Sequence, residues 1–296
     1  MGSALGGLLA RNNEVILVAR RPHVKAIRKA GLRLTGDVRR NVQLTTFEDV
    51  HGIVPPELLL ITTKAYDTQI AVAECRVWAS DETAVLTLQN GIGNLEALTE
   101  WKGDLALGGT TTLGSTMLSP GRVRISGLGN TYIGSEADPR LAKEVVRCFL
   151  ASGIPATFHP NIESEIWAKA VISSCINSLT AILRVPNGRI LENQAISQMM
   201  RAITLECERV VRARGVRLPQ ARMYPRARAV ARDTSKNLSS MLQDVLKGRR
   251  TEIDQLNGAF WRLSDELGFD SPLNMTLTAM VHSLPLGHSR NVNIGT

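Results

Sequence analysis

The stretch MGSALGGLLARNNEVILVARR, residues 1–21, begins with a Gly-rich helical pattern over 2–11 and continues into an apolar run over 15–19. In a dinucleotide-binding G-x-G-x-x-G turn, two glycines let the backbone approach the pyrophosphate, and the last glycine lets the helix pack closely on a strand. Gly2 matches only the last of these glycines. The stretch therefore predicts the later part of a nucleotide-binding β-α-β unit, although an ordinary helix that contains glycines would look similar.

Three further apolar runs follow, LLLITT at 58–63, AVLTLQ at 84–89 and LALGGTTT at 105–112, with helix-like segments between most of them. Continuous apolar strands separated by helices are typical of a parallel sheet that is covered on both faces. The strand pattern stops near residue 160, and the later sequence has a helical pattern. We therefore predict the α/β class, with a doubly wound Rossmann-type parallel sheet domain followed by an all-α C-terminal domain.

The predicted domain boundary follows Pro155 and Pro160. An NADP-binding Rossmann-type domain is expected over 1–160, with its first strand and part of its Gly-rich turn missing. An all-helical substrate and catalytic domain is expected over 161–296. A chain of 296 residues is long enough for two domains that each bury a core.

The composition is that of an ordinary globular protein, with 44% hydrophobic and 21% charged residues. No apolar run approaches the roughly 20 residues that span a bilayer, so we expect a cytoplasmic protein with no membrane partner. The net charge of +8 favours anionic partners. Because only 4% of residues are aromatic, the arginines between Arg201 and Arg232 are interpreted as a solvated helix face, not a nucleic-acid surface.

The cysteines give no metal-binding pattern. They are scattered along the chain without a CxxC pair or a histidine at ligand spacing, so we expect reduced thiols and no metal. The four are Cys75, Cys148, Cys175 and Cys207.

Basic and polar residues follow the predicted strands of the first domain. Arg20 and Arg21 come directly after the run at 15–19, where a carboxylate would select NAD and an arginine would meet the 2′-phosphate of NADP. Lys64 and Asn90 follow the next two runs, at the strand ends where open parallel sheets bind ligands. These positions predict NADPH as the cofactor, with ordinary polar loops as the alternative.

The helix pattern over 165–183 carries one polar stripe on an otherwise apolar surface. Lys169, Ser173, Asn177 and Thr180 recur at helical spacing and so share one face. Burial of the lysine would lower its pKa toward the range useful for acid–base chemistry. A lysine that extends to solvent is the alternative.

A second polar cluster lies at 237–258. Thr251 and Asp254 have the spacing of a capping box, so Thr251 is expected to start a helix that has Glu252 in its first turn. Carboxylates are stabilised at that position by the helix dipole. Glu252 could alternatively orient the lysine.

Four motifs together resemble the ketopantoate reductase, or 2-dehydropantoate 2-reductase, family, over residues 1 to about 277. These motifs are LQNGIGNLE (88–96), GRVRISG with TYIGS (121–135), IWAKAVISSCINSLTAIL with VPNG (166–188) and NLSSMLQDVLKGRRTEIDQLNG (237–258). The resemblance implies NADPH-dependent reduction of 2-dehydropantoate to pantoate, on the route to pantothenate and coenzyme A, and it makes a homodimer plausible.

The resemblance also implies roles for particular residues. Lys169 would be the general acid, and Glu252 would contact the end of the site where substrate and cofactor meet. The implied substrate contacts are Asn90, Ser173, Asn177, Asn187, Asn237 and Ser240. The implied cofactor contacts are Gly2, Arg20, Lys64, Asn90, Gly114 and Glu252.

Two departures from the family pattern leave alternatives open. Ser173 stands where the family usually has asparagine, and Leu113 stands where it often has histidine. One alternative is therefore a paralogous NADPH-dependent reductase of another 2-oxo acid, and a second is a nucleotide-binding protein without catalysis. The family begins with a strand and a complete Gly-rich turn, so we also expect roughly ten residues to be missing before Met1.

Overall fold

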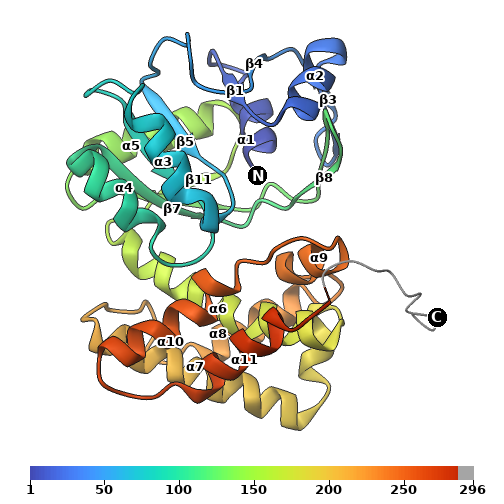
Figure 1. Cartoon of the computed structure of the whole chain (residues 1–296), viewed down its shortest axis with the longest axis vertical. Helices are drawn as coiled ribbons and strands as arrows, with labels where there is room; N and C mark the ends of the chain where they lie inside the picture. Colours follow the sequence, from blue (N-terminus) through green and yellow to red (C-terminus); the bar gives the residue numbers. More distant parts are fainter. Residues whose placement is uncertain (286–296) are drawn as a thin grey trace. The chain divides into compact units, whose positions relative to one another are not determined.

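The computed structural model describes residues 1–285, which form two compact units. The first unit contains residues 1–89 and 93–162, and the second contains residues 90–92 together with the described residues from 163 onward. Figure 1 shows strands and helices in the first unit and helices in the second. The predicted fold class is confirmed, with some antiparallel strands added to the parallel ones.

The main sheet of the first unit has five strands in the order β11-β10-β7-β6-β5. The strands β5, β6 and β7 are parallel, β10 runs antiparallel to β7, and β11 is parallel to β10. The predicted runs at 58–63, 84–89 and 105–112 supply its three consecutive parallel strands. The bounds are Leu58–Ile61 (β5), Ala84–Thr87 (β6), Ala106–Thr111 (β7), Thr131–Gly134 (β10) and Ala156–Phe158 (β11).

Two smaller sheets complete the first unit. A parallel pair is formed by β1 and β4, and a four-stranded sheet has the order β3-β2-β9-β8. Among the described residues β1 pairs only with β4, and β5 pairs only with β6; the expected additional strand stays a prediction. The bounds are Ile16–Val18 (β1), Leu32–Gly36 (β2), Arg40–Val42 (β3), Thr45–Phe47 (β4), Ser115–Ser119 (β8) and Arg122–Ile125 (β9).

The helices of the first unit follow recognisable local signals. In α5, Asp138 accepts hydrogen bonds from the amides of Arg140 and Leu141, both at 2.9 Å, and Pro139 occupies the first helical position. The other helices and 3₁₀ turns pack on or connect the sheets. The bounds are Gly2–Leu9 (α1), Arg21–Ala30 (α2), Ala65–Asp67 (η1), Thr68–Arg76 (α3), Asn94–Lys102 (α4), Gly103–Leu105 (η2) and Pro139–Ala151 (α5).

The second unit is helical throughout its regular structure, as predicted. Its core gathers around α6, whose side chains Trp167, Val171 and Cys175 are buried together with Phe260 of α10. The bounds are Ile162–Leu183 (α6), Asn187–Leu191 (η3), Gln194–Ala213 (α7), Tyr224–Asp233 (α8), Ser240–Leu246 (α9), Ile253–Gln255 (η4), Asn257–Glu266 (α10) and Pro272–His282 (α11).

Helix α6 corrects one expectation. We expected no apolar run of bilayer-spanning length, but its 22 residues have a mean hydropathy of 1.5 over the most apolar window, which by length and composition alone would suffice to cross a membrane. However, 67% of that window is buried inside the protein. The apolar character of α6 is that of a central core helix, because most of its apolar side chains belong to the buried cluster of the second unit.

The capping box at Thr251 was also wrong. The structure places Glu252 at the start of the short turn η4, without a side-chain capping bond, and α10 begins only at Asn257. The backbone of Leu256 has φ −113° and ψ −103°, which lies outside the helical region and separates the two elements.

Candidate active site

Helix α6 leaves Lys169 and Ser173 partly exposed, one turn apart, while residues 174–181 that follow are all buried. The polar stripe is therefore partly exposed at Lys169 and Ser173 and buried at Asn177 and Thr180.

The ammonium group of Lys169 has a perturbed pKa. Burial lowers the pKa of Lys169 to about 8, and the carboxylate of Glu252 acts in the opposite direction by favouring the charged form. Glu252 is itself buried, with 7% of its surface exposed. A lysine with this pKa is mostly protonated at neutral pH and can still release its proton, which suits a general acid.

The polar stripe continues from α6 to the start of α9. Asn177 has 9% of its surface exposed, and Thr180 has none. The Thr180 hydroxyl is hydrogen-bonded to the Ser239 hydroxyl at 2.7 Å, and Ser239 Oγ accepts from the amide of Leu242, which caps α9. Thr180 therefore anchors the helix that Ser240 begins.

Asn187 and Asn237 lie on two segments that are joined by hydrogen bonds. The backbone N–H of Asn187 donates to the backbone carbonyl of Asn237 at 2.9 Å. The side-chain Nδ2 of Asn187 donates to the Thr234 hydroxyl, also at 2.9 Å. Asn187 is buried, whereas Asn237 and Ser240 are exposed. The structure thus gives Asn187 a role in holding the loop that carries Asn237, and its direct contact with substrate stays a prediction.

Sequence reasoning missed Ser239 and proposed only its neighbour Ser240. Ser239 is buried and serves as the cap of α9, a role that its position three residues before Leu242 could have indicated. The side chain of Ser240, in contrast, is exposed at the first position of that helix.

Asn90 belongs to the second unit, although the residues on both sides of its short segment belong to the first. The amide of Ile92 donates to the carbonyl of Gln255 at 2.9 Å, which places segment 90–92 on η4. Glu252 stands at the start of the same turn. The structure therefore brings two predicted site residues, Asn90 and Glu252, to one short element.

The predicted cofactor residues of the first unit lie at element ends. Gly2 begins α1, and a Cβ atom there would come within 2.4 Å of Thr62 Oγ1, just beyond β5. Arg20 is exposed directly before α2, and Lys64 precedes η1. A glycine at a helix start, an exposed Arg20 and a half-buried Lys64 after strands fit the phosphate groups of a dinucleotide.

Gly114 has a structural explanation in the fold. Its amide donates to the Gly127 carbonyl and its carbonyl accepts from the Ser126 amide, both at 2.9 Å. A Cβ atom at this position would lie 2.6 Å from Ser126 Oγ. The packing of β8 against β9 thus accounts for this glycine, and its contact with cofactor stays a prediction.

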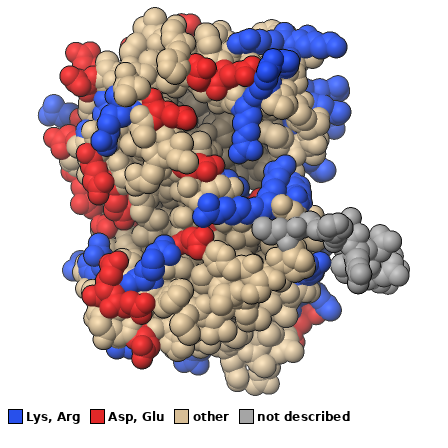
Figure 2. Space-filling view, in the orientation of Figure 1, with Lys and Arg blue, Asp and Glu red and all other residues tan. Residues whose placement is uncertain are grey.

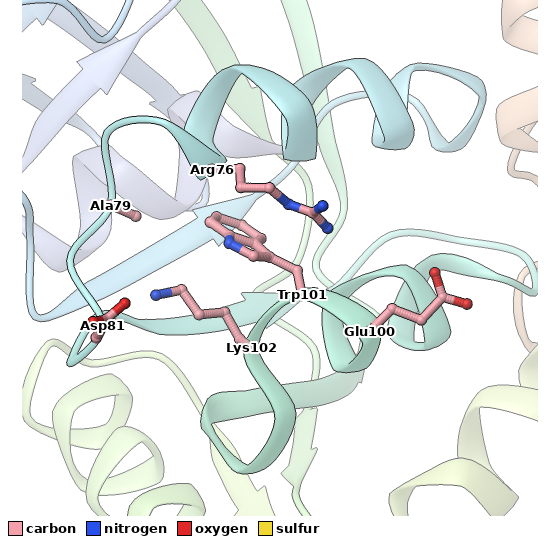
Figure 3. Close-up of a pocket in the computed structure, with 6 residues that line it drawn as sticks. All are labelled: Arg76, Ala79, Asp81, Glu100, Trp101 and Lys102. Atoms are coloured by element: carbon pink, nitrogen blue, oxygen red, sulfur yellow. The ribbon is translucent and has the colours of Figure 1, made fainter.

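A surface hollow of about 490 Å³ lies away from these residues, at the C-terminal ends of α3 and α4. Figure 3 shows the Trp101 ring between the side chains of Arg76 and Lys102. Lys64 lies near the opposite end of α3, and none of the predicted site residues lines the hollow. We therefore place the candidate site elsewhere, at α6, η4 and the segments joined to them.

A Rossmann-type unit, a helical unit and a lysine with a lowered pKa are the arrangement found in two-domain dehydrogenases and reductases. Residues 1–138 match the family described as ketopantoate reductase PanE/ApbA, and residues 161–284 match its C-terminal domain. The chain belongs to the ketopantoate reductase family.

Relatives and solved structures agree with this family. The 2-dehydropantoate 2-reductase of Archaeoglobus fulgidus is 37% identical over 97% of this chain and 95% of its own length. That of Pyrococcus horikoshii is 35% identical over 95% of this chain and 93% of its own. A ketopantoate reductase structure from Ralstonia eutropha, 33% identical, has a TM-score of 0.88 and covers 95% of this chain and 94% of that one.

One further similar structure is that of an enzyme with another name. A D-mandelate dehydrogenase with NADH and anilino(oxo)acetate has a TM-score of 0.89 at 26% identity, covering 96% of this chain and 95% of that one.

Proposed function

We propose that this protein reduces 2-dehydropantoate to pantoate with NADPH. The observation that carries the proposal is Lys169, an accessible lysine in an apolar helix, whose pKa is lowered to about 8 by burial and which has Glu252 beside it. The names of the relatives supply the substrate, and family membership makes it the first one to test.

The chemistry requires a proton donor near a carbonyl oxygen. When bound, the nicotinamide would supply hydride to the carbonyl carbon. Negative charge then develops on the carbonyl oxygen, and the Lys169 ammonium would stabilise that charge and donate a proton from Nζ. Glu252 keeps enough positive character on Lys169 for this role, because its carboxylate favours the protonated amine.

The remaining predicted residues would hold the two anions. Arg20, Lys64 and the start of α1 at Gly2 would bind the cofactor phosphates. Asn90, Ser173, Asn177, Asn237 and Ser240 would orient the substrate through its hydroxyl and carboxylate. A homodimer and a cytoplasmic location stay predictions.

Purified protein with NADPH and 2-dehydropantoate tests the proposal, with NADH and a panel of other 2-oxo acids as comparison. We expect the highest kcat/KM with NADPH and 2-dehydropantoate. Turnover of other 2-oxo acids without turnover of 2-dehydropantoate would contradict the substrate. Tight NADPH binding without any turnover would instead support the non-catalytic alternative.

A second candidate is the reduction of an aryl 2-oxo acid. It is favoured by the high structural similarity to D-mandelate dehydrogenase and by the small side chain of Ser173, one turn from Lys169. Phenylglyoxylate belongs in the substrate panel for this reason. A kcat/KM for phenylglyoxylate above that for 2-dehydropantoate would favour this second candidate.

A further inference from the structure

Segment 90–92 is fixed to η4 by its backbone. The Ile92 amide donates to the Gln255 carbonyl at 2.9 Å. Gly91 has φ +92°, and a Cβ atom there would lie 2.6 Å from the Gln255 carbonyl oxygen and 2.8 Å from Gln255 Cβ. Only glycine combines this left-handed conformation with so close an approach. The residue after Asn90 is therefore tightly constrained by η4.

The turn η4 itself is a compact platform. The Gln255 amide donates to the Glu252 carbonyl at 3.1 Å, and the Leu256 amide donates to the Ile253 carbonyl at 3.2 Å. Ile253 anchors the turn in the core with only 1% of its surface exposed. Glu252 at one end and the carbonyl of Gln255 at the other thus belong to one short turn, which is buried at Glu252 and Ile253 and half-buried at Asp254 and Gln255.

We propose that Gly91 and Gln255 are positioning residues that hold Asn90 in a fixed place relative to Glu252 and Lys169. This inference rests on the proposed function, because it assigns the contact a role in orienting the reactants. The backbone contact between Ile92 and Gln255 transmits the position of η4 to Asn90. A displacement of about 1 Å in such a group can lower the rate about 100-fold.

The chain offers a matched control two residues away. Gly93 has φ +96°, nearly the same as Gly91, but a Cβ atom there would have nothing within 4 Å. Alanine at either position meets a nearly equal left-handed backbone strain. The variants Gly91→Ala and Gly93→Ala therefore differ in whether the new methyl group collides with Gln255.

Steady-state kinetics of the two variants test the inference. We expect Gly91→Ala to lower kcat about 100-fold and Gly93→Ala to lower it less than about threefold. The pH at which kcat declines should not move in either variant, since Lys169 and Glu252 keep their own environment. Equal effects of the two substitutions, or a shifted pH profile in Gly91→Ala, would overturn the proposal.

A double-mutant cycle shows whether Gly91 acts through Asn90. If it does, Gly91→Ala should have no further effect in an Asn90→Ala background. Full additivity of the two effects would show that Gly91 acts by another route.

Hydrogen exchange in the wild-type protein remains informative if Gly91→Ala does not fold. The Ile92 amide should exchange at least about tenfold more slowly than in an unstructured peptide, because it is bonded to Gln255. Exchange at the unstructured rate would contradict the proposed contact. If the wild-type protein turned over none of the 2-oxo acids, the proposed function would fail. The exchange rate of the Ile92 amide would still test the contact, so the two proposals can fail separately.

Discussion

Lys169 combines a partly exposed side chain with a strongly lowered pKa. The cause is local, because burial disfavours the ammonium form while the carboxylate of Glu252 partly restores it. The balance leaves a pKa of about 8, which lies close to the pH at which an enzyme of metabolism operates.

The lowered pKa predicts a pH dependence for the reduction. The donor must be protonated, so kcat should fall as pH rises through about 8. Lys169→Arg would keep the positive charge with a pKa far above that of Lys169, so the variant should lose most activity and should not show that decline. A profile of kcat against pH for both proteins checks this. An unchanged decline in Lys169→Arg would assign it to another group.

Arg20 and Arg21 are expected to differ in their effect on cofactor choice. Arg21 already has an ion pair with Glu48 at 3.8 Å, whereas Arg20 is exposed directly before α2. Arg20→Ala should raise the KM for NADPH about 10-fold to 100-fold, the value of a charge-assisted phosphate contact, and leave the KM for NADH unchanged. Arg21→Ala serves as the control. A larger effect of Arg21→Ala would reverse the assignment.

The polar stripe of α6 was predictable from spacing, but the partners of its members were not. Helical periodicity places Lys169, Ser173, Asn177 and Thr180 on one face, and the structure confirms that all four lie on the single helix α6. The bond from Thr180 to Ser239 joins residues that are 59 positions apart, and no local pattern encodes such a pairing. The same limit explains why Ser240 was proposed and Ser239 was missed.

Among the elements, α6 and α9 are joined through buried hydroxyl groups. Thr180→Val keeps the shape of the side chain and removes the bond to Ser239, which should lower the free energy of unfolding by about 1 to 3 kcal/mol. Thr278→Val is a matched control, because the Thr278 hydroxyl bonds the Asn274 carbonyl within its own helix. Chemical denaturation measures both. Equal losses would show that the link between the helices contributes nothing.

The strands show what alternation and run length can reveal. The buried runs of β5, β6 and β7 were found because a parallel sheet makes them continuously apolar. The four-stranded sheet was not found, because β2 and β9 are half-polar, as in the exposed-buried alternation of 122–125. In addition, β2 pairs with β9 with Arg33 opposite Arg122, and these strands lie far apart in the sequence, so no local pattern indicates that they are neighbours.

At the scale of the whole molecule, charge is unevenly distributed. Figure 2 shows Lys and Arg side chains gathered on the side of the first unit where α2 and β8 lie, and Asp and Glu on the side of α3 and α4. With a net charge of +8 the protein attracts anions, and both 2-dehydropantoate and NADPH are anions.

This charge predicts sensitivity to salt. Raising the ionic strength shortens the screening length from about 10 Å at 0.1 M to about 3 Å at 1 M, so kcat/KM should fall while kcat changes less. Initial rates at increasing concentrations of sodium chloride give kcat/KM as a function of ionic strength. The same series in sodium acetate shows whether the effect depends on the kind of anion. A kcat/KM that stays constant over this range would show that long-range attraction does not contribute.

The most direct test of the central claim follows the oxidation of NADPH by 2-dehydropantoate in the wild-type protein and in Lys169→Ala. Proton donation by a positioned side chain contributes about 100-fold to 10,000-fold to a rate. We predict turnover by the wild-type protein and a loss of this size in kcat for Lys169→Ala, with NADPH binding retained. Equal kcat values for the two proteins would contradict the account.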